Sequence, residues 1–160
     1  ETREHNRQEL LAAFNRLYHE MDDLYHAYAR RSGISDTALW LLYALCESGE
    51  TPTQRELCAA WYYAPQTLNS ALKSMERGGL LRLLPMPGSQ KNKRIALTQE
   101  GEALKRRVVG PLIEAEIRAG EWLSPDEGQA LIALTARYVK FLRHEIHLLP
   151  GEKGEDNPEN

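Results

Sequence analysis

The chain has 160 residues, of which 42% are hydrophobic and 27% are charged, and its formal net charge at pH 7 is −3. These values are typical of one globular domain, with or without additional helices, and they exclude an intrinsically disordered chain. No apolar run reaches the roughly 18 residues that span a bilayer, and no secretory signal is visible at the start. Two cysteines, Cys46 and Cys58, make no disulfide framework, so we expect a cytoplasmic protein.

The first predicted element is a long helix between His5 and Ser32. It is predicted to end at Gly33 in a left-handed conformation, and a second helix is predicted from its N-cap at Asp36 to Gly49. The first helix is predicted because apolar residues recur in steps of four and three: Leu10, Phe14, Leu17, Met21, Leu24 and Tyr28.

Two shorter helices follow in close succession. Thr53, with Glu56 three residues later, forms a capping box at the start of a short helix. After a turn over residues 61–64, Pro65 suits the first position of the next helix. Gly78 and Gly79 are predicted to terminate that helix.

A β-hairpin and two long helices complete the chain. The apolar segments 80–84 and 94–97 flank a loop that contains Pro85, Pro87 and Gly88, which predicts two short strands. Thr98 is predicted to cap a helix that runs to about residue 122 and bends at 110–111, because proline removes a backbone donor. A capping box at Ser124 opens the last helix, and the acidic tail 150–160 is predicted to be disordered.

The helix predicted over residues 65–77 has two unlike faces. The apolar side carries Leu68, Ala71, Leu72 and Met75. The opposite side carries short polar side chains and cations in place of the mixed Glu and Lys of an ordinary solvated face: Gln66, Asn69, Ser70, Lys73 and Arg77, with Thr67 and Ser74 on one flank.

Basic residues are concentrated in the same region. Between Pro65 and Thr98 there are six Lys and Arg residues and one acid, Glu76, a surplus of five positive charges in a chain whose net charge is −3. Charge separated in this way steers polyanions to one surface. An exposed polar helix face or a basic loop is by itself usually just solvated surface, so the argument for a polyanion rests on their combination.

The predicted elements are, in order, a short helix, a tight turn, an amphipathic helix and a basic hairpin. This order predicts a winged helix-turn-helix. The second helix of such a unit enters the major groove of DNA, and a basic hairpin tip can reach the adjacent minor groove. We therefore predict sequence-specific binding to double-stranded DNA. The predicted contact residues are Thr53, Gln54, Pro65, Gln66, Thr67, Asn69, Ser70, Lys73, Arg77, Lys91, Lys93 and Arg94.

The segments TQRELCAAWYYAPQTLNSALKSMERGGLL and KNKRIALTQEGEAL, which begin at Thr53 and Lys91, resemble the MarR family of bacterial transcriptional regulators. Aligned on RIALT, Lys91 and Arg94 take the places of two family arginines, and Ser89 takes the place of an acid that normally braces the wing. Tyr62 stands where the family often has glycine. The resemblance implies a homodimer in which the first and last helices of the two chains interleave.

The predicted organisation follows from both arguments. It comprises an N-terminal dimerisation helix (1–33), the winged helix-turn-helix (34–98), C-terminal dimerisation helices (99–149) and the tail (150–160). The apolar stripes 10–28 and 131–149 are long for one chain to cover, which independently favours association. A two-fold dimer places its recognition helices roughly 34 Å apart on a pseudo-palindromic operator.

The resemblance also implies control by a small molecule bound between the dimerisation helices and the DNA-binding lobe. The predicted protein is thus a repressor relieved by a small aromatic or amphipathic effector, with no other cofactor. An ordinary aromatic core is the competing interpretation for each candidate residue. The candidates are Tyr18, Tyr25, Tyr28, Trp40, Tyr43 and Trp61.

Other functions have weaker support in the sequence. The histidine pairs 19/26 and 144/147 lack the converging ligands that zinc requires, so no metal site is predicted. Cys58 is expected to be a small core residue instead of a redox sensor. No catalytic motif occurs, so an enzyme is not predicted. A winged-helix scaffold that binds protein instead of DNA stays as the alternative, and apolar or acidic residues at Gln66, Ser70 and Lys73 would have favoured it.

Overall fold

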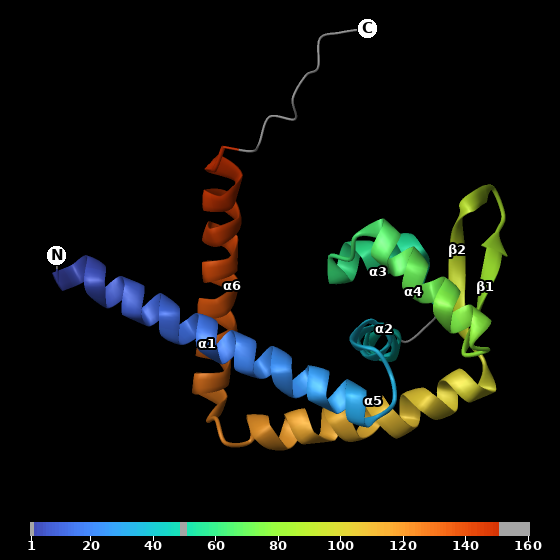
Figure 1. The fold of residues 1–160 in the computed structure, drawn as a ribbon, viewed down its shortest axis with the longest axis horizontal. Coiled ribbons are helices and arrows are strands. Elements are labelled where there is room, and N and C mark those ends of the chain that lie inside the picture. Colours follow the sequence, from blue (N-terminus) through green and yellow to red (C-terminus); the bar gives the residue numbers. More distant parts are fainter. Residues whose placement is uncertain (1, 49–50, 151–160) are drawn as a thin grey trace, which may run out of the picture. The chain divides into compact units, whose positions relative to one another are not determined.

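The computed structural model describes residues 2–48 and 51–150, without the side chains of residues 2–4 and 89–91. Within these ranges it has six helices and a two-stranded antiparallel sheet, which confirms the predicted mostly helical fold with a small hairpin (Figure 1). The elements are α1 (Thr2–Arg31), α2 (Asp36–Glu47), α3 (Gln54–Trp61), α4 (Pro65–Arg77), β1 (Leu81–Met86), β2 (Ser89–Leu97), α5 (Gln99–Gly120) and α6 (Pro125–Leu148).

The chain divides into two compact units, residues 1–113 and 114–160. The first contains α1 to β2 and the beginning of α5, so α1 and the winged helix-turn-helix belong to the same unit. The second contains the end of α5 and α6. The dimerisation roles of 1–33 and 99–149 stay predictions, and the predicted tail lies outside the described residues apart from Pro150.

The turn between α1 and α2 is centred on Gly33. Its φ of 74° confirms the predicted left-handed end of the first helix, and the Ile34 amide closes the turn by donating to the Ala29 carbonyl at 3.1 Å. The prediction of Asp36 as N-cap is wrong by one residue. Ser35 is the cap, because its backbone is extended and its hydroxyl accepts from the Ala38 amide at 3.2 Å. The predicted stop at Gly49 lies outside the described residues.

The core of the first unit forms around α2. This helix is apolar on most of its sides, and five of its twelve residues are buried. Helix α4 adds Leu68, Leu72 and Met75, which lie four and three residues apart and therefore on one face. The remaining buried apolar residues come from the elements around α2: Ala29, Leu57, Leu81, Ile95, Leu104, Val108, Val109 and Leu112.

The turn between α3 and α4 depends on Tyr62. Its φ of 53° and ψ of 29° place it in the left-handed region, where it is the one non-glycine residue with positive φ in the described ranges. The sequence position that resembles a family glycine therefore does need a left-handed backbone, and here tyrosine supplies it. Pro65 occupies the predicted first turn of α4, and α4 ends before Gly78 as predicted.

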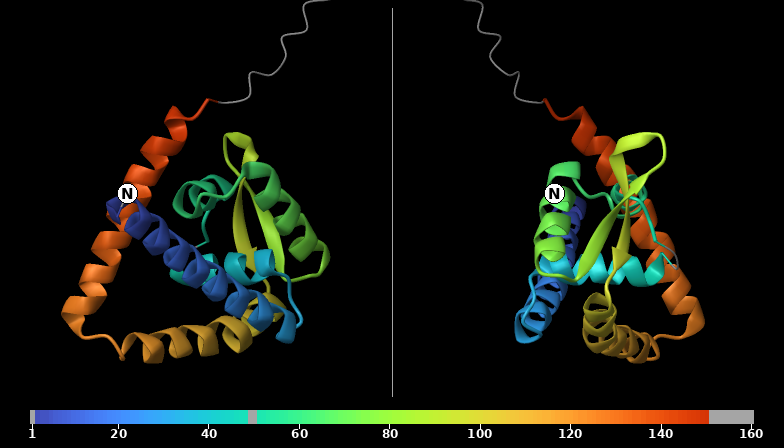
Figure 2. Two further views of the ribbon diagram at one scale, coloured as in Figure 1. Left: turned by 60° about the vertical axis from the view of Figure 1, so that its left-hand side comes forward. Right: turned by 90° about the vertical axis from the view of Figure 1, so that its right-hand side faces the viewer.

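The strands of the hairpin, which is the predicted wing, are longer than predicted. Leu81 pairs with Leu97, and the register continues outward to Pro85 opposite Lys93, with an irregularity between Pro85 and Met86. The prediction that Pro85 lies in the loop is wrong. In a two-stranded sheet each strand is an edge, and proline is tolerated there because its missing N–H costs no ladder bond. The wing lies beside α4 (Figure 2).

Thr98 joins the wing to α5, as predicted. Its hydroxyl accepts from the Gly101 amide at 3.1 Å and donates to the Gly79 carbonyl at 2.6 Å, which ties the first turn of α5 to the end of α4. The Thr98 amide donates to the Leu80 carbonyl at 3.0 Å. Helix α5 continues through Pro111 and ends at Gly120, two residues before the predicted end.

Helix α6 begins with the predicted capping box. The Ser124 hydroxyl accepts from the Glu127 amide, and the Glu127 carboxylate accepts from the Ser124 amide at 2.8 Å. The structure describes every residue of α6, and none of them is buried. Its exposed large apolar residues are Leu131, Ile132, Leu134, Val139, Phe141, Leu142, Ile146 and Leu148.

Candidate nucleic-acid interface

The outer face of α4 is polar and open to solvent. Gln66, Thr67, Ser70 and Lys73 are exposed, and Asn69 is half-buried at the edge of the same face. The opposite face is held in the core by Leu68, Leu72 and Met75, so the helix cannot rotate without exposing them. The predicted two-faced character of this helix is therefore confirmed.

The start of α4 can receive an anion. Ala64 is its N-cap, and among the described side chains none caps the helix there. Proline at the first position removes one amide, while the following amides lie at the positive end of the helix dipole. A phosphate oxygen is a suitable acceptor for such a helix start.

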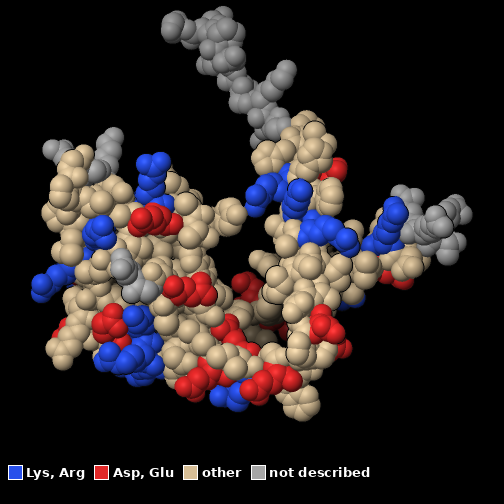
Figure 3. Space-filling view, turned by 180° about the vertical axis from the view of Figure 1, so that it is seen from behind, with Lys and Arg blue, Asp and Glu red and all other residues tan. Residues whose placement is uncertain are grey.

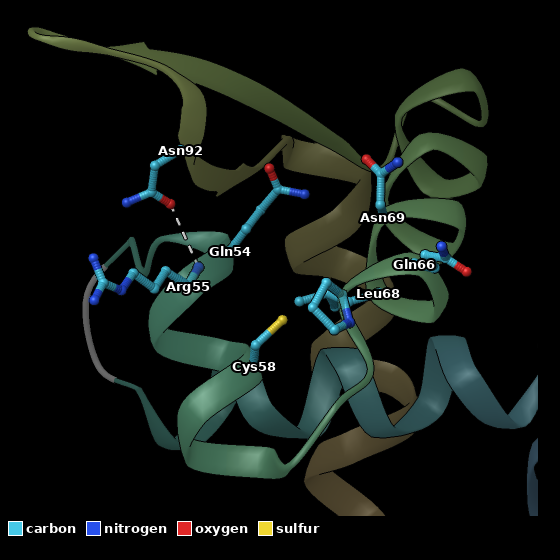
Figure 4. Close-up of a pocket in the computed structure, with 8 residues that line it drawn as sticks. Gln54, Arg55, Cys58, Gln66, Leu68, Asn69 and Asn92 are labelled. Carbon is cyan, nitrogen blue, oxygen red and sulfur yellow. Dashed lines mark hydrogen bonds between the residues drawn. The ribbon is translucent and has the colours of Figure 1, made fainter. Parts of the chain in front are cut away.

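One groove lies beside the beginning of α4, between α3 and β2, and has a volume of about 600 Å³. Figure 4 shows Gln54 extending from the first turn of α3 toward the side on which Asn69 projects from α4, while the Arg55 guanidinium points away from α4. Gln66 also lines this groove, and Asn92 borders it from β2. Amide groups from three elements thus surround a space that is open to solvent.

A second groove, of about 260 Å³, follows the other flank of α4 where the start of α2 approaches it. Five hydroxyl side chains line it, and no Lys, Arg, Asp or Glu does. Helix α4 therefore stands between two grooves, one lined by amides and Arg55 and one lined by hydroxyls. The hydroxyl residues are Ser35, Thr37, Thr67, Ser70 and Ser74.

Thr53 is a structural residue, which argues against the predicted DNA contact of its side chain. Its exposed fraction is 4%, and its hydroxyl accepts from the Glu56 amide at 3.2 Å. The Glu56 carboxylate accepts from the Thr53 amide at 2.7 Å in return. These bonds lower the pKa of Glu56, and the positive charge of Arg94 lowers it further. The capping box was recognisable in the sequence, and a capping box requires this hydroxyl to accept from the Glu56 amide.

The predicted wing cations occupy different places. Arg94 is not at the tip: it pairs with Leu84, and its guanidinium donates to the Thr51 carbonyl at 3.3 Å. The tip is the turn at Gly88, whose φ is 79°. Lys93 lies on β2 nearer to that turn, opposite Pro85. The side chain of Lys91 lies outside the described residues.

Strand β2 of the wing is attached to the first turn of α3 and to the segment that precedes it. The Ile95 amide donates to the Pro52 carbonyl at 2.8 Å, and the Asn92 side-chain oxygen accepts from the Arg55 amide at 3.4 Å (Figure 4). Sequence reasoning missed Arg55, Asn92 and Thr37, because they come from elements whose closeness to α4 depends on tertiary packing.

A surplus of positive over negative charge is concentrated in the region of α4 and the wing. The segment from Pro65 to Thr98 has a surplus of five positive charges in a chain of net charge −3. Seen from behind, the molecular surface has basic and acidic side chains interspersed (Figure 3). A polyanion is therefore favoured at α4 and the wing over the surface in general.

Four of the six predicted effector residues come together in the first unit. Trp40 lies at the centre, with ring-centroid distances of 4.8 Å to Tyr25, 5.7 Å to Tyr43 and 6.2 Å to Trp61. Tyr28 is apart from them, and its hydroxyl donates to the Val108 carbonyl at 2.7 Å. Tyr18 is exposed on α1. An effector site at the four clustered rings stays a prediction.

Metal, redox and membrane functions gain no further support. The part of the chain that the structure describes contains no group of three His, Cys, Asp or Glu residues arranged to hold a metal ion. Cys46 is exposed, whereas Cys58 is half-buried and packs against the core while lining the groove beside α3. None of the described helices is both long and apolar enough to cross a membrane.

Known proteins share both the sequence and the fold of this lobe. Residues 32–91 match the sequence model of the MarR family. This segment of the chain therefore resembles the winged-helix domain of the MarR family. The HTH-type transcriptional regulator PecS of Dickeya dadantii (strain 3937) is 40% identical to it over 76 residues, which cover 48% of this chain and 46% of PecS. The match thus spans less than half of that regulator.

Solved structures extend the likeness in fold from residues 32–91 to most of the chain. NMB1585, a MarR family regulator from Neisseria meningitidis, superposes with a TM-score of 0.74 at 15% identity, over 86% of this chain and 96% of NMB1585. MepR of S. aureus, in a complex with DNA, superposes with a TM-score of 0.67 at 21% identity, over 82% of this chain and 96% of MepR. At such identities the likeness establishes the fold.

Proposed function

We propose that this chain binds double-stranded DNA sequence-specifically and regulates transcription, as a repressor that a small molecule releases. The observation that carries the proposal is the outer face of α4, which presents short polar side chains and Lys73 to solvent with a cationic wing beside it. The matches to the MarR family and to PecS support it. The proposed role is non-catalytic and implies a cytoplasmic location, where bacterial chromosomal DNA lies.

In this proposal α4 enters the major groove, where Gln66 and Asn69 read base edges. Amide side chains suit adenine, whose N6 and N7 offer one donor and one acceptor. The two grooves that flank α4 receive the two sugar-phosphate strands that border the major groove. Arg55 and Asn92 then contact one strand, and Thr37 and Ser74 contact the other.

We propose further that two copies of the chain form the binding unit. Helices α1 and α6 each present exposed large apolar residues, and single-chain proteins seldom leave such long apolar faces open to water. Two-fold symmetry then requires an operator with two inverted half-sites. The four clustered aromatic rings of Tyr25, Trp40, Tyr43 and Trp61 suit a small aromatic or amphipathic effector.

The test begins with selection of bound sequences from random duplexes, followed by titration of the selected duplex at several salt concentrations. Each phosphate contact contributes a slope of about 0.9 to the salt dependence of binding. Lys73→Ala should lower that slope and weaken all duplexes alike. Asn69→Ala should leave the slope unchanged and reduce discrimination at one base pair by about 1–3 kcal/mol.

Arg106→Ala serves as the matched control, because Arg106 is an exposed cation on α5 outside the proposed interface. It should change neither the slope nor the base preference. Absence of binding to any duplex at low salt overturns the proposal, and capture of a protein ligand by the same α4 face would favour the scaffold function in its place.

A further inference from the structure

Glu76 holds strand β1 of the wing to the end of α4. It is the only acid among the residues from Pro65 to Thr98, and its side chain is exposed. Its carboxylate accepts a hydrogen bond from the Leu83 backbone amide at 3.0 Å. The one negative charge of the basic segment therefore has a specific partner on β1.

The residue that pairs with Leu83 in the hairpin is also hydrogen-bonded to a neighbouring segment. Leu83 pairs with Ile95 across the two strands. The Ile95 amide donates to the Pro52 carbonyl at 2.8 Å, just before α3 begins. Both amides of this pair thus point outward: the Leu83 amide bonds the end of α4, and the Ile95 amide bonds the segment just before α3.

We propose that Glu76 is a positioning residue for DNA binding, which fixes the wing relative to α4 so that both engage one DNA site. This inference rests on the proposed function. A carboxylate near a DNA-binding face repels phosphate, which weakens association. Without Glu76 the Leu83 amide could donate to water, so the carboxylate is not needed to satisfy it. What the carboxylate adds is a fixed orientation of the wing relative to α4. The structure assigns to Glu76 two opposing effects on DNA affinity, repulsion and positioning.

Two substitutions separate these effects. Glu76→Gln keeps an acceptor oxygen for the Leu83 amide and removes the charge, so it should bind DNA as tightly as wild type or more tightly. Glu76→Ala removes both charge and acceptor, so it should bind about three- to tenfold more weakly than Glu76→Gln, the range expected for one hydrogen bond. If Glu76 were only an exposed acid, both variants would bind alike.

Two readouts locate the effect in the wing. The difference between the variants should disappear on a duplex truncated to the base pairs beneath α4, because the wing then has no DNA to contact. In the DNA-free protein, hydrogen exchange of the Leu83 amide should be faster in Glu76→Ala than in wild type, and little changed in Glu76→Gln. Glu100→Gln and Glu100→Ala, at an exposed acid in the first turn of α5, should bind DNA equally.

Each failure has its own meaning. Equal DNA affinity of the two Glu76 variants, with wild type binding normally, overturns the positioning role alone. Equal Leu83 exchange in the two variants overturns it as well. Failure of wild type to bind any duplex overturns the proposed function on which the inference rests.

Discussion

Replacement of Gly101 by alanine should destabilise the DNA-binding lobe, although alanine is the better helix former. Gly101 is buried in the first turn of α5, where the chain crosses the start of β1. A Cβ atom there would overlap the Leu80 carbonyl oxygen, lie 2.9 Å from the carbonyl carbon and lie 3.1 Å from a methyl group of Leu97. The Leu80 carbonyl also accepts from the Thr98 amide at 3.0 Å, so relief of the overlap must disturb that bond.

The magnitude follows from opposing contributions. Alanine gains about 1 kcal/mol of helix propensity, while overpacking against atoms that cannot rotate away costs about 1–3 kcal/mol and the strained hydrogen bond a further 0.5–1.5 kcal/mol, roughly. We expect a net loss of about 0.5–3.5 kcal/mol, and each kcal/mol lowers Tm by about 2–4 °C for a chain of this size. Urea unfolding followed by circular dichroism measures it, at one protein concentration for all variants because association shifts stability.

Gly128→Ala is the matched control. Gly128 lies in α6, and a Cβ atom there meets nothing within 4 Å. This variant should gain about 0.5–1 kcal/mol, the ordinary preference of a helix for alanine over glycine. If Gly101→Ala is as stable as wild type while Gly128→Ala gains, the close approach of α5 to β1 does not constrain the fold as argued.

Three further predictions concern the helix ends. Thr53→Val should lower unfolding stability by about 0.5–2 kcal/mol through loss of the cap, yet the folded protein should keep its DNA affinity; a selective loss of affinity in titrations would return Thr53 to the interface. Tyr62→Gly should raise the urea midpoint, since glycine adopts positive φ without the strain of roughly 1–2 kcal/mol that a side chain has there, and a lower midpoint would contradict this. Glu56 and Glu127 both have a pKa lowered below 4.5 by hydrogen bonds from their cap residues. Their contribution is therefore present above that pH and lost as pH falls through the folded-state pKa. The variant Glu56→Gln/Glu127→Gln should show a shallower loss of stability in acid titrations, and an unchanged acid profile would count against the caps.

Local signals in the sequence were sufficient for most element boundaries. The capping boxes at Thr53 and Ser124 and the glycine at 33 are each recognisable within four residues of chain, because a helix end is decided by its neighbours. Asp36 was misassigned because Ser35 and Asp36 are both good N-caps, and only the backbone conformation distinguishes them. Pro85 was misplaced for a similar reason, since proline signals a loop unless its strand is an edge.

The candidate interface was predicted in part. The outer face of α4 followed from helical periodicity alone. The place of Arg94 could not be predicted in this way. Arg94 forms a backbone bridge with Thr53, about forty residues earlier in the chain, and this bridge depends on the approach of β2 to the segment before α3. The same holds for Asn92 and for the hydroxyl-lined groove beside Thr37, where residues distant in sequence meet. Periodicity describes the face of one helix, whereas grooves between helices depend on tertiary packing.

Helix α6 has 24 residues, and none is buried within its own chain. In proteins most of the stability of a helix comes from packing of its apolar face, and less of it from backbone propensity. In the dimer proposed above a second copy covers the apolar face of α6, so dilution should unravel α6 before the leucine-rich α2. Hydrogen-exchange protection of α6 should then rise with protein concentration. The abundance of the protein in a cell would then set how much of it is competent to act, before any operator or effector is encountered.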